Sequence, residues 1–336
     1  MSKSTILILL SISMLILAIL DVRSGSVSVP FAEFQLWVSG GETSDVFNFI
    51  VVQSRIPKAL TAILCGAALS LAGLLMQTLF RNPLAGPYLL GISSGAGLGV
   101  ALLVMGAGFM GFVVATGAAI NVAAIIGALV MMFILLAVSF KLKDVMTLLI
   151  FGVMMGSIAT AIIGLIQFFT SDFQLKSFII LTLGSLSAVS YVELFILFAS
   201  LVLSVAYALY NYKGLNAVLV SEDFAKMLGI NVLHVRLSIV LITGVLAGLT
   251  TAFCGPIGFV GIIIPNLSRL LLKSNDHLLL IPTCILLGAN VLLLIDLISH
   301  IPTNGTSLPI NSITSILGIP IILWILFGKK NISQSF

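Results

Sequence analysis

The sequence predicts an all-α protein that crosses a lipid bilayer about ten times. Of its 336 residues 60% are hydrophobic and only 8% are charged, and the mean hydropathy is +1.27. Soluble domains normally carry about 25% charged residues. Apolar runs of the ~20 residues that a helix needs to cross the hydrocarbon core recur along the whole chain. We therefore expect a single transmembrane domain over residues 1–336 and exclude a soluble globular protein.

The polar segments are too short to hold a nucleotide-binding domain. The P-loop spacing is absent, because Gly328-Lys329 lacks its upstream glycine. The three cysteines lie singly in apolar runs, and the three histidines lie at predicted span ends without ligand-like spacing. We expect no cofactor and no metal site, and the basic residues lie at membrane edges and do not indicate nucleic acid. Any energy from ATP must therefore come from another chain.

Ten membrane spans are predicted from the apolar runs. The first half holds the runs 5–22, 58–80, 88–107, 112–139 and 145–169. The second half holds the runs 190–211, 235–254, 257–273, 278–299 and 309–328. The run 257–273 is short and contains Pro265, so we expect it to be tilted, broken or partly re-entrant.

An even number of spans places both termini on the same side of the membrane. The first apolar run resembles a signal peptide, but no small-x-small cleavage site follows it, and we interpret it as an uncleaved helix. Eleven of the 15 Lys and Arg residues fall on the side of the termini. Because positive charge concentrates on the cytoplasmic side, both termini are predicted to be cytoplasmic.

Residues 24–50 are mixed and acidic and are predicted to form an extracytoplasmic loop. Within this loop the segment FAEFQLWV is amphipathic, which indicates a short helix at the membrane interface. Trp37 suits such a position, since tryptophan is enriched at membrane–water boundaries.

The most informative stretch is 54–97, in which an apolar span ends in the break RNPLAGP at 81–87 and a glycine-rich span follows. Irregular polar backbone is tolerated only at a membrane face or beside a cavity, so the break indicates a transport pathway. A faint repeat relates this stretch to the second half. Leu71-Ala72-Gly73 precedes Leu89-Leu90-Gly91, as Leu246-Ala247-Gly248 precedes Phe259-Val260-Gly261. The two copies run in opposite directions, which predicts inverted repeats.

Small residues spaced four apart recur in the spans and predict close packing of helix backbones in lipid. Direct contact with substrate is the alternative interpretation of the same residues. The glycines concerned are Gly91, Gly95, Gly99, Gly152, Gly156, Gly244 and Gly248.

The segment Gly91-Ile92-Ser93-Ser94-Gly95 also matches the G-x-S-x-G elbow of hydrolases. That motif requires a strand before it, a helix after it, and an acid and a histidine later in the chain. Here the flanks are predicted membrane helices, and the available pair is Asp296 with His300, which the topology places on the outer face. A membrane hydrolase is therefore kept only as a third hypothesis.

The longest cytoplasmic loop, 212–234, contains a predicted helix whose two ends are marked by capping residues. Ser221 suits the N-cap, and the carboxylates of Glu222 and Asp223 favour the positive end of a helix. Gly229 suits the C-terminal cap. These residues predict a helix of about two turns, too short to be stable by itself in water.

The apolar face of this short helix is expected to consist of Phe224, Met227 and Leu228. Since the helix is not stable alone, its face must dock on something. Either it packs against the span ends of its own chain, or it enters a groove of a partner protein.

On the opposite side of the membrane, Arg55 and Lys58 break the positive-inside pattern where the second span begins. Isolated outward cations are usually only solvated. Two cations three residues apart, flanking Pro57 at a helix start, instead indicate a patch for an acidic partner.

These motifs resemble the membrane permease subunits of binding-protein-dependent ABC importers for iron-siderophores, haem and cobalamin, the type II importers. The resemblance covers residues 50–328 in family order. Beyond residues 54–97, it rests on LGSL, SEDFAKMLGI, GPIGFVGIIIPNLSR, DHLLLIPTCILLGANVLLLIDL and LPINSITSILGIPIILWIL.

The resemblance implies a ten-helix permease of the bacterial inner membrane that works as a pair. The pair is either two copies of this chain or this chain with a paralogue. Two cytoplasmic ATPase subunits and an extracytoplasmic substrate-binding protein complete the assembly. The expected cargo is an iron-siderophore complex, and haem and cobalamin are less favoured alternatives.

The resemblance also implies roles for individual residues. The segment 221–229 resembles the helix that couples the permease to the ATPase. Docking of the binding protein is assigned to Arg55, Lys58 and His300. The inner gate is assigned to Asn82, Leu84, Val145 and Met146.

Three positions depart from the family pattern. Asn266 stands where histidine is usual, and Asn311 stands where glycine is usual. His300 replaces an arginine, which would make docking there pH-dependent, because a free histidine titrates near pH ~6.5.

An ion-coupled secondary transporter is the alternative function, since it could share inverted repeats. Such a protein is expected to carry intramembrane acids that face a cavity. In this chain Glu193 and Asp296 both lie near the outer ends of their predicted spans, which favours the ABC importer.

Overall fold

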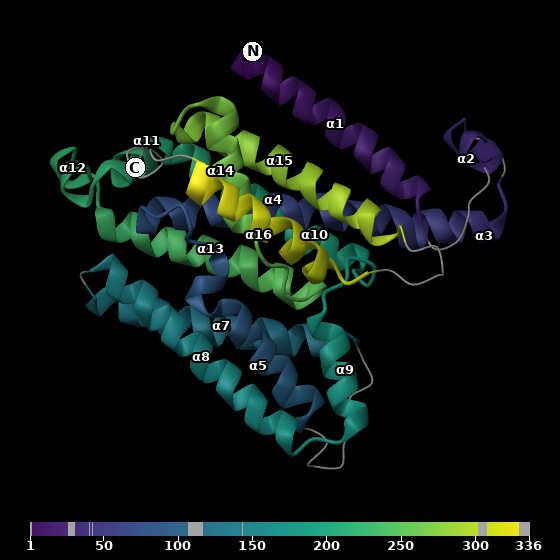
Figure 1. Cartoon of the computed structure of the whole chain (residues 1–336), viewed down its shortest axis with the longest axis horizontal. Helices are drawn as coiled ribbons and strands as arrows, with labels where there is room; N and C mark the ends of the chain where they lie inside the picture. Colours follow the sequence, from purple (N-terminus) through teal and green to yellow (C-terminus); the bar gives the residue numbers. More distant parts are fainter. Residues whose placement is uncertain are drawn as a thin grey trace.

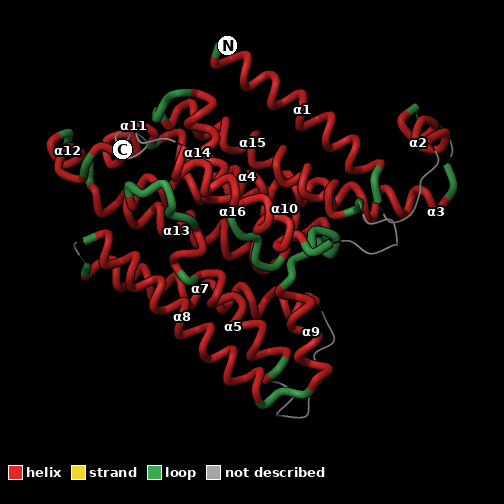
Figure 2. Tube along the Cα trace, in the orientation of Figure 1, coloured by secondary structure: helices red, strands yellow, loops and turns green. Residues whose placement is uncertain are grey.

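The computed structural model describes residues 2–25, 31–39, 41, 43–106, 117–142, 144–301 and 308–328. All regular secondary structure within these residues is helical (Figure 2). The first half holds α1 (Lys3–Arg23), α2 (Phe31–Val38), α3 (Asp45–Asn48), the π-helix η1 (Phe49–Arg55), α4 (Ile56–Phe80), the 3-10 helix η2 (Pro87–Leu90), α5 (Ile92–Val104), α7 (Gly117–Lys141) and α8 (Val145–Phe168). The second half holds α9 (Asp172–Thr182), α10 (Tyr191–Tyr210), α11 (Tyr212–Val220), α12 (Glu222–Met227), α13 (Val232–Cys254), α14 (Val260–Leu272), α15 (His277–Ser299) and α16 (Ile310–Gly328).

Each of the ten predicted spans contains one apolar helix. Among the described residues, seven helical stretches are long and apolar enough to cross a membrane, and three shorter apolar helices, α5, α14 and α16, account for the other predicted spans. The polytopic all-α class is therefore confirmed. The run 257–273, which contains Pro265, forms the single short helix α14 and is not broken at the proline.

Helix α4 lies at the centre of the bundle, with α10, α13, α14 and α15 packed around it (Figure 1). It is rich in Ala, Gly and Ser and buried along nearly its whole length. Its backbone meets its neighbours directly, because a Cβ atom on Gly66 would collide with the carbonyl of Gly288, and one on Gly73 with the carbonyl of Gly261. Small residues thus let the α4 backbone pack closely on both α15 and α14.

A second group of helices, α5, α7 and α8, lies beside this centre, with α9 across one end (Figure 1). Helices α5 and α7 approach closely where Gly95 faces Gly127 and where Gly99 faces the carbonyl of Ala123. Helix α13 joins the two groups, since it packs against both α4 and α7.

The predicted loop 24–50 is partly wrong at its C-terminal end. Helix α2 occupies the FAEFQLWV segment as expected, but α3 and η1 continue into α4, so that residues 45–80 form one helical stretch. Ser44 starts this stretch by accepting a hydrogen bond from the backbone N–H of Phe47 (3.3 Å). Helices α9 and α11 were not predicted.

The two halves pack in a crossed manner. Gly73 of the first LAG segment lies against Gly261 of the second half, and Gly248 of the second LAG segment lies against Ile92, next to Gly91 of the first half. Each LAG helix therefore packs on the short helix of the other half, an arrangement that fits inverted repeats.

The contact at Gly73 gives a first testable prediction. In a Gly73→Ala variant the added methyl group has no room against the Gly261 carbonyl, and overpacking of this kind costs about 1–3 kcal/mol of stability. Thermal unfolding of the detergent-purified chain should show a clear decrease in melting temperature. The matched control is Gly164→Ala on α8, where nothing lies within 4 Å of the new atom; equal melting temperatures for the two variants would contradict the packing argument.

Candidate functional site

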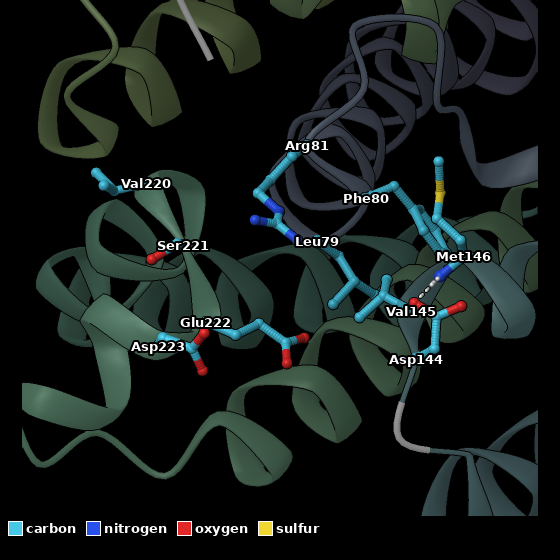
Figure 3. Close-up of a pocket in the computed structure, with 10 residues that line it drawn as sticks. All are labelled: Leu79, Phe80, Arg81, Asp144, Val145, Met146, Val220, Ser221, Glu222 and Asp223. Atoms are coloured by element: carbon cyan, nitrogen blue, oxygen red, sulfur yellow. Dashed lines mark hydrogen bonds between the residues drawn. The ribbon is translucent and has the colours of Figure 1, made fainter.

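A cavity of about 570 Å³ opens at the end of the bundle that holds α11 and α12, which we call the α12 end (Figure 3). Three elements meet there: the C-terminal end of α4, the N-terminal end of α8 and the junction between α11 and α12. Arg81 and Glu222 project into the space from opposite sides (Figure 3). The lining residues are Leu79, Phe80, Arg81, Asp144, Val145, Met146, Val220, Ser221, Glu222 and Asp223.

Helix α12 forms at the predicted place and with the predicted caps. The Ser221 hydroxyl accepts a hydrogen bond from the backbone N–H of Phe224 (3.0 Å). Gly229 follows the helix with φ +77°, a conformation that favours glycine over residues with a Cβ atom. Lys226 and Asp223 form an exposed ion pair of 3.0 Å on the same helix.

The apolar face of α12 is open. Met227 is 79% exposed, Leu228 is 59% exposed and Phe224 is 39% exposed, whereas Ala225 is buried. The interpretation that this face packs against the span ends of its own chain therefore does not describe the structure. A short amphipathic helix with an open apolar face has the form of a helix that docks in a groove.

The four predicted gate residues separate into two pairs. Val145 and Met146 line the cavity, the first buried and the second half-exposed. Asn82 and Leu84 are not among its lining residues. They form a turn of their own, in which the Asn82 side chain accepts a hydrogen bond from the backbone N–H of Leu84 (2.9 Å).

Asp144 fixes the start of α8, directly before Val145 and Met146. Its carboxylate accepts hydrogen bonds from the Thr147 hydroxyl (2.7 Å) and from the backbone N–H groups of Thr147 (2.9 Å) and Met146 (3.3 Å). These hydrogen bonds favour the ionised form, and they hold the pKa of Asp144 below its usual value. A negative charge is thereby kept at the positive end of α8.

The break at 81–87 is held by polar side chains from α4 and α14. The Asn266 amide donates to the carbonyl of Pro83 (2.7 Å), and the Gln77 amide donates to the same carbonyl (2.9 Å). The side chains of Arg269 and Gln77 are hydrogen-bonded to each other. Sequence analysis missed Gln77 and Arg269. Polar residues within apolar spans usually face the protein interior and have a partner there, which could have drawn attention to both.

Asn311 acts in a similar way at the second break. Its side-chain oxygen accepts a hydrogen bond from the backbone N–H of Gly258 (3.0 Å), just before α14. Both asparagines that depart from the family pattern thus stabilise irregular backbone beside a short helix.

An open groove of about 540 Å³ runs along α8, next to η2 and the start of α5, and we call it the polar groove after the hydroxyl groups that lie among its mainly apolar lining. Three hydroxyl side chains, those of Ser94, Ser157 and Thr160, line it. Sequence analysis missed them because serine and threonine are also common in packed spans. The other lining residues are Tyr88, Leu89, Gly91, Gly152, Val153, Gly156 and Ala161.

The seven predicted packing glycines all lie against neighbouring helices. Gly91, Gly152 and Gly156 bring η2 and α5 against α8, as the packing interpretation predicts, and they also line the polar groove. Helix α7 is the common neighbour of the others, which are Gly95, Gly99, Gly244 and Gly248.

The structural context of a hydrolase elbow is absent around Ser93. A 3-10 helix, not a strand, precedes it, and its hydroxyl lies 3.0 Å from that of Thr251 in a buried hydrogen bond. Asp296, the acid of the proposed hydrolase pair, is bound to Lys58 by an ion pair of 2.7 Å.

The predicted docking patch is corrected by the structure. Arg55 and Lys58 are buried at the opposite end of the bundle, which we call the α3 end. Lys58 joins three helices there, since its ammonium group lies 3.5 Å from Asp21 of α1 and 2.7 Å from Asp296 of α15. Arg55 donates to the carbonyl of Arg23 (2.6 Å). Both cations therefore bind groups within the chain and do not form an exposed patch. The buried carboxylates near Lys58 need such a partner because they are removed from water.

His300 belongs to the same cluster. Its Nε2 atom accepts a hydrogen bond from the Lys58 ammonium group (2.7 Å) when the ring is neutral. Burial, and then the positive charge of Lys58, lower the pKa of His300 below its usual value. The histidine is therefore neutral at pH 7 and becomes charged only at a pH below that of a free histidine.

The buried cluster gives a second prediction. A Lys58→Met variant removes the ammonium group that lies between Asp21 and Asp296, and loss of one partner from a buried ion pair costs about 3–5 kcal/mol. Thermal unfolding should show a large decrease in stability. The combination with Asp21→Asn and Asp296→Asn should recover part of it, and Lys176→Met on the exposed side of α9 should have no effect. A stable single variant would show that the cluster does not hold the three helices together.

Comparison with known proteins identifies the family. A model described as the FecCD transport family matches residues 12–328. The chain belongs to this family. It is 35% identical to a vitamin B12 import system permease protein of Klebsiella pneumoniae over 88% of this chain and 87% of that protein. It is 34% identical to the corresponding permease of Salmonella newport over 95% of this chain and 94% of that one.

A solved structure leads to the same conclusion. It is described as an inward-facing conformation of a transporter assigned to the metal-chelate type of ABC transporters, and it superposes with a TM-score of 0.84. The two chains are 27% identical, and the match covers 97% of this chain and all of the other. This member of the FecCD family is thus a permease of a type II ABC importer, a transport subunit without catalytic activity of its own, and the secondary transporter is set aside.

Proposed function

We propose that the chain is the membrane pathway of an importer for a metal chelate, in which α12 receives the movement of a cytoplasmic ATPase. One observation carries this proposal. Helix α12, which has an exposed apolar face, and the Val145–Met146 end of α8 line the same cavity. Docking of α12 on a cytoplasmic ATPase places the α12 end and both termini in the cytoplasm, in line with the distribution of Lys and Arg.

The polar groove along α8 is the proposed wall of the pathway. The groove is open on one side. Apolar side chains of α8 such as Met154 and Ile158 are at least half exposed. A second permease subunit, either another copy or a paralogue, would close the groove and cover these apolar residues. The hydroxyls of Ser94, Ser157 and Thr160 would then face the cargo.

The remaining partners follow from the same arrangement. Two ATPase subunits would bind, one to each α12, and the extracytoplasmic binding protein would dock at the α3 end. Because Arg55 and Lys58 are buried there, their proposed contribution is to fix the ends of α1, α4 and α15 beneath the docked protein, with His300 at the edge. The complex would lie in the inner membrane of a bacterium.

The cargo is proposed as a metal chelate and not a free ion. An iron-siderophore complex is the cargo that sequence analysis favoured, and cobalamin is the cargo named for two relatives at 34–35% identity. Both are bulky metal chelates, and the names of the relatives support cobalamin as a candidate cargo beside the iron-siderophore complex.

The coupling role of α12 is tested by a Phe224→Asp, Leu228→Asp double variant. Charges on the open face should prevent docking in an apolar groove, so co-purification of the ATPase subunits and uptake should both fall at least ~10-fold, which corresponds to ~1.4 kcal/mol of binding. Insertion of the chain into the membrane should be unchanged. Lys213→Gln on the exposed side of α11 is the control, and wild-type uptake by the double variant would refute the assignment.

The cargo is tested with the complete transporter in proteoliposomes, loaded with its binding protein. We expect ATP-dependent accumulation of either a labelled iron-siderophore complex or labelled cobalamin, and none of free ferric or cobalt ions. The double variant of α12 serves as the inactive control. Transport of a free metal ion at the rate of the chelate would contradict the proposal.

A further inference from the structure

A buried arginine connects α12 to the gate end of α8. Arg236 lies near the start of α13 and is only 5% exposed. One of its terminal nitrogens forms an ion pair with the carboxylate of Glu222 in α12 (2.8 Å). The other donates a hydrogen bond to the carbonyl of Leu142 (2.9 Å), at the end of α7. A single guanidinium group thus holds two elements that are far apart in the sequence.

The position of Leu142 makes this connection relevant to the gate. Leu142 lies two residues before Asp144, which caps α8 and is followed directly by Val145 and Met146. Leu142 directly follows Lys141, the last residue of α7, at a helix end where carbonyl groups lack partners within the helix. Because the chain leads from Leu142 to Asp144 through a single residue, a displacement of the Leu142 carbonyl displaces the start of α8.

Direct packing does not provide the same link. Between the start of α12 and the start of α8 lies the cavity of about 570 Å³, which separates Ser221 and Glu222 from Val145 and Met146 (Figure 3). Across a cavity, a small movement of one wall is not passed to the other by contact of side chains. The side chain of Arg236 instead joins Glu222 of α12 to the Leu142 carbonyl by a route beside the cavity.

The chemistry of the residue suits this task. Arginine keeps its charge when buried, and its planar fork holds two acceptors in a fixed geometry, which lysine cannot do. A buried charge of this kind is costly unless its partners remain in place. Movement of Glu222 should therefore pull the guanidinium group along, together with the Leu142 carbonyl bound to it.

We propose that Arg236 is the positioning residue that transmits the displacement of α12 to the α7–α8 turn and thereby to the gate pair. The inference rests on the proposed function, in which α12 is moved by the ATPase. Glu222 supplies the moving end of this relay, and the Leu142 carbonyl supplies the gate end. Loss of the relay should leave ATP hydrolysis running while the gate no longer follows it.

The test uses the complete transporter in proteoliposomes and measures cargo transported per ATP hydrolysed. In Arg236→Gln we expect ATPase subunits to bind and ATP hydrolysis to stay within about twofold of wild type, while transport per ATP falls at least tenfold. Arg236→Lys, which keeps the charge but not the fork, should fall in between. Lys213→Gln, which removes an exposed positive charge from α11 and leaves α12 unchanged, should behave as wild type.

A second measurement separates a relay from a merely structural residue. Spin labels on the exposed side chains of Lys226 in α12 and Met146 in α8, each paired with a label at Lys176 on α9, report the two movements separately. ATP should shift both distances in the otherwise wild-type complex, but only the α12 distance in Arg236→Gln. Equal shifts of the Met146 label in both proteins would overturn the proposal.

The outcomes distinguish the relay from the proposed function. If the wild-type complex neither binds ATPase subunits nor transports a chelate, the proposed function is refuted and the relay with it. If the wild type transports and Arg236→Gln transports as much per ATP, the relay alone is refuted. Should Arg236→Gln fail to assemble, Glu222→Gln decides by the same ratio, because it removes the charge of the ion pair and keeps the shape of α12; an unchanged ratio overturns the relay.

Discussion

The direct approach of the α4 backbone to its neighbours is the constraint on which the rest of the structure depends. At Gly66 and Gly73 the partner is a carbonyl group of another helix, and Pro265 leaves the Gly261 carbonyl without its usual helical donor. In lipid there is no hydrophobic gain from bringing apolar helices together, so van der Waals contact between backbones must hold the bundle. Every element of the candidate site is attached to this centre, either at one end of α4 or through α13.

Irregular backbone and charge are both placed at the ends of this centre. The breaks before α5 and α14 are held by Asn266 and Asn311, whose side chains bind backbone groups that no helix satisfies. Lys58 ties three helices at the α3 end, and Arg236 ties α12 to α7 and α13 at the α12 end. The chain thus has one end held together by buried ion pairs and one end with a cavity, which fits the proposed gate at the α12 end.

Part of the site could be predicted from the sequence because its signals are local. The caps of α12 and the break at 81–87 depend on neighbouring residues, so Ser221 and Gly229 were assigned their places correctly. The fate of Arg55 and Lys58 could not be predicted in this way. Their partners, such as Asp21 and Asp296, are distant in sequence, and an outward cation that is solvated looks the same in sequence as one that is buried and paired.

By itself, the sequence determined the all-helical membrane class, the ten apolar helices and the short capped helix, since hydropathy and capping act over a few neighbouring residues. The tertiary structure decided which charges are buried, that Asn82 and Leu84 lie apart from the cavity that Val145 and Met146 line, and that one guanidinium group bridges α12 and α7. These features depend on contacts between helices far apart in the chain, and almost every helix face is apolar, so periodicity could not show which faces meet.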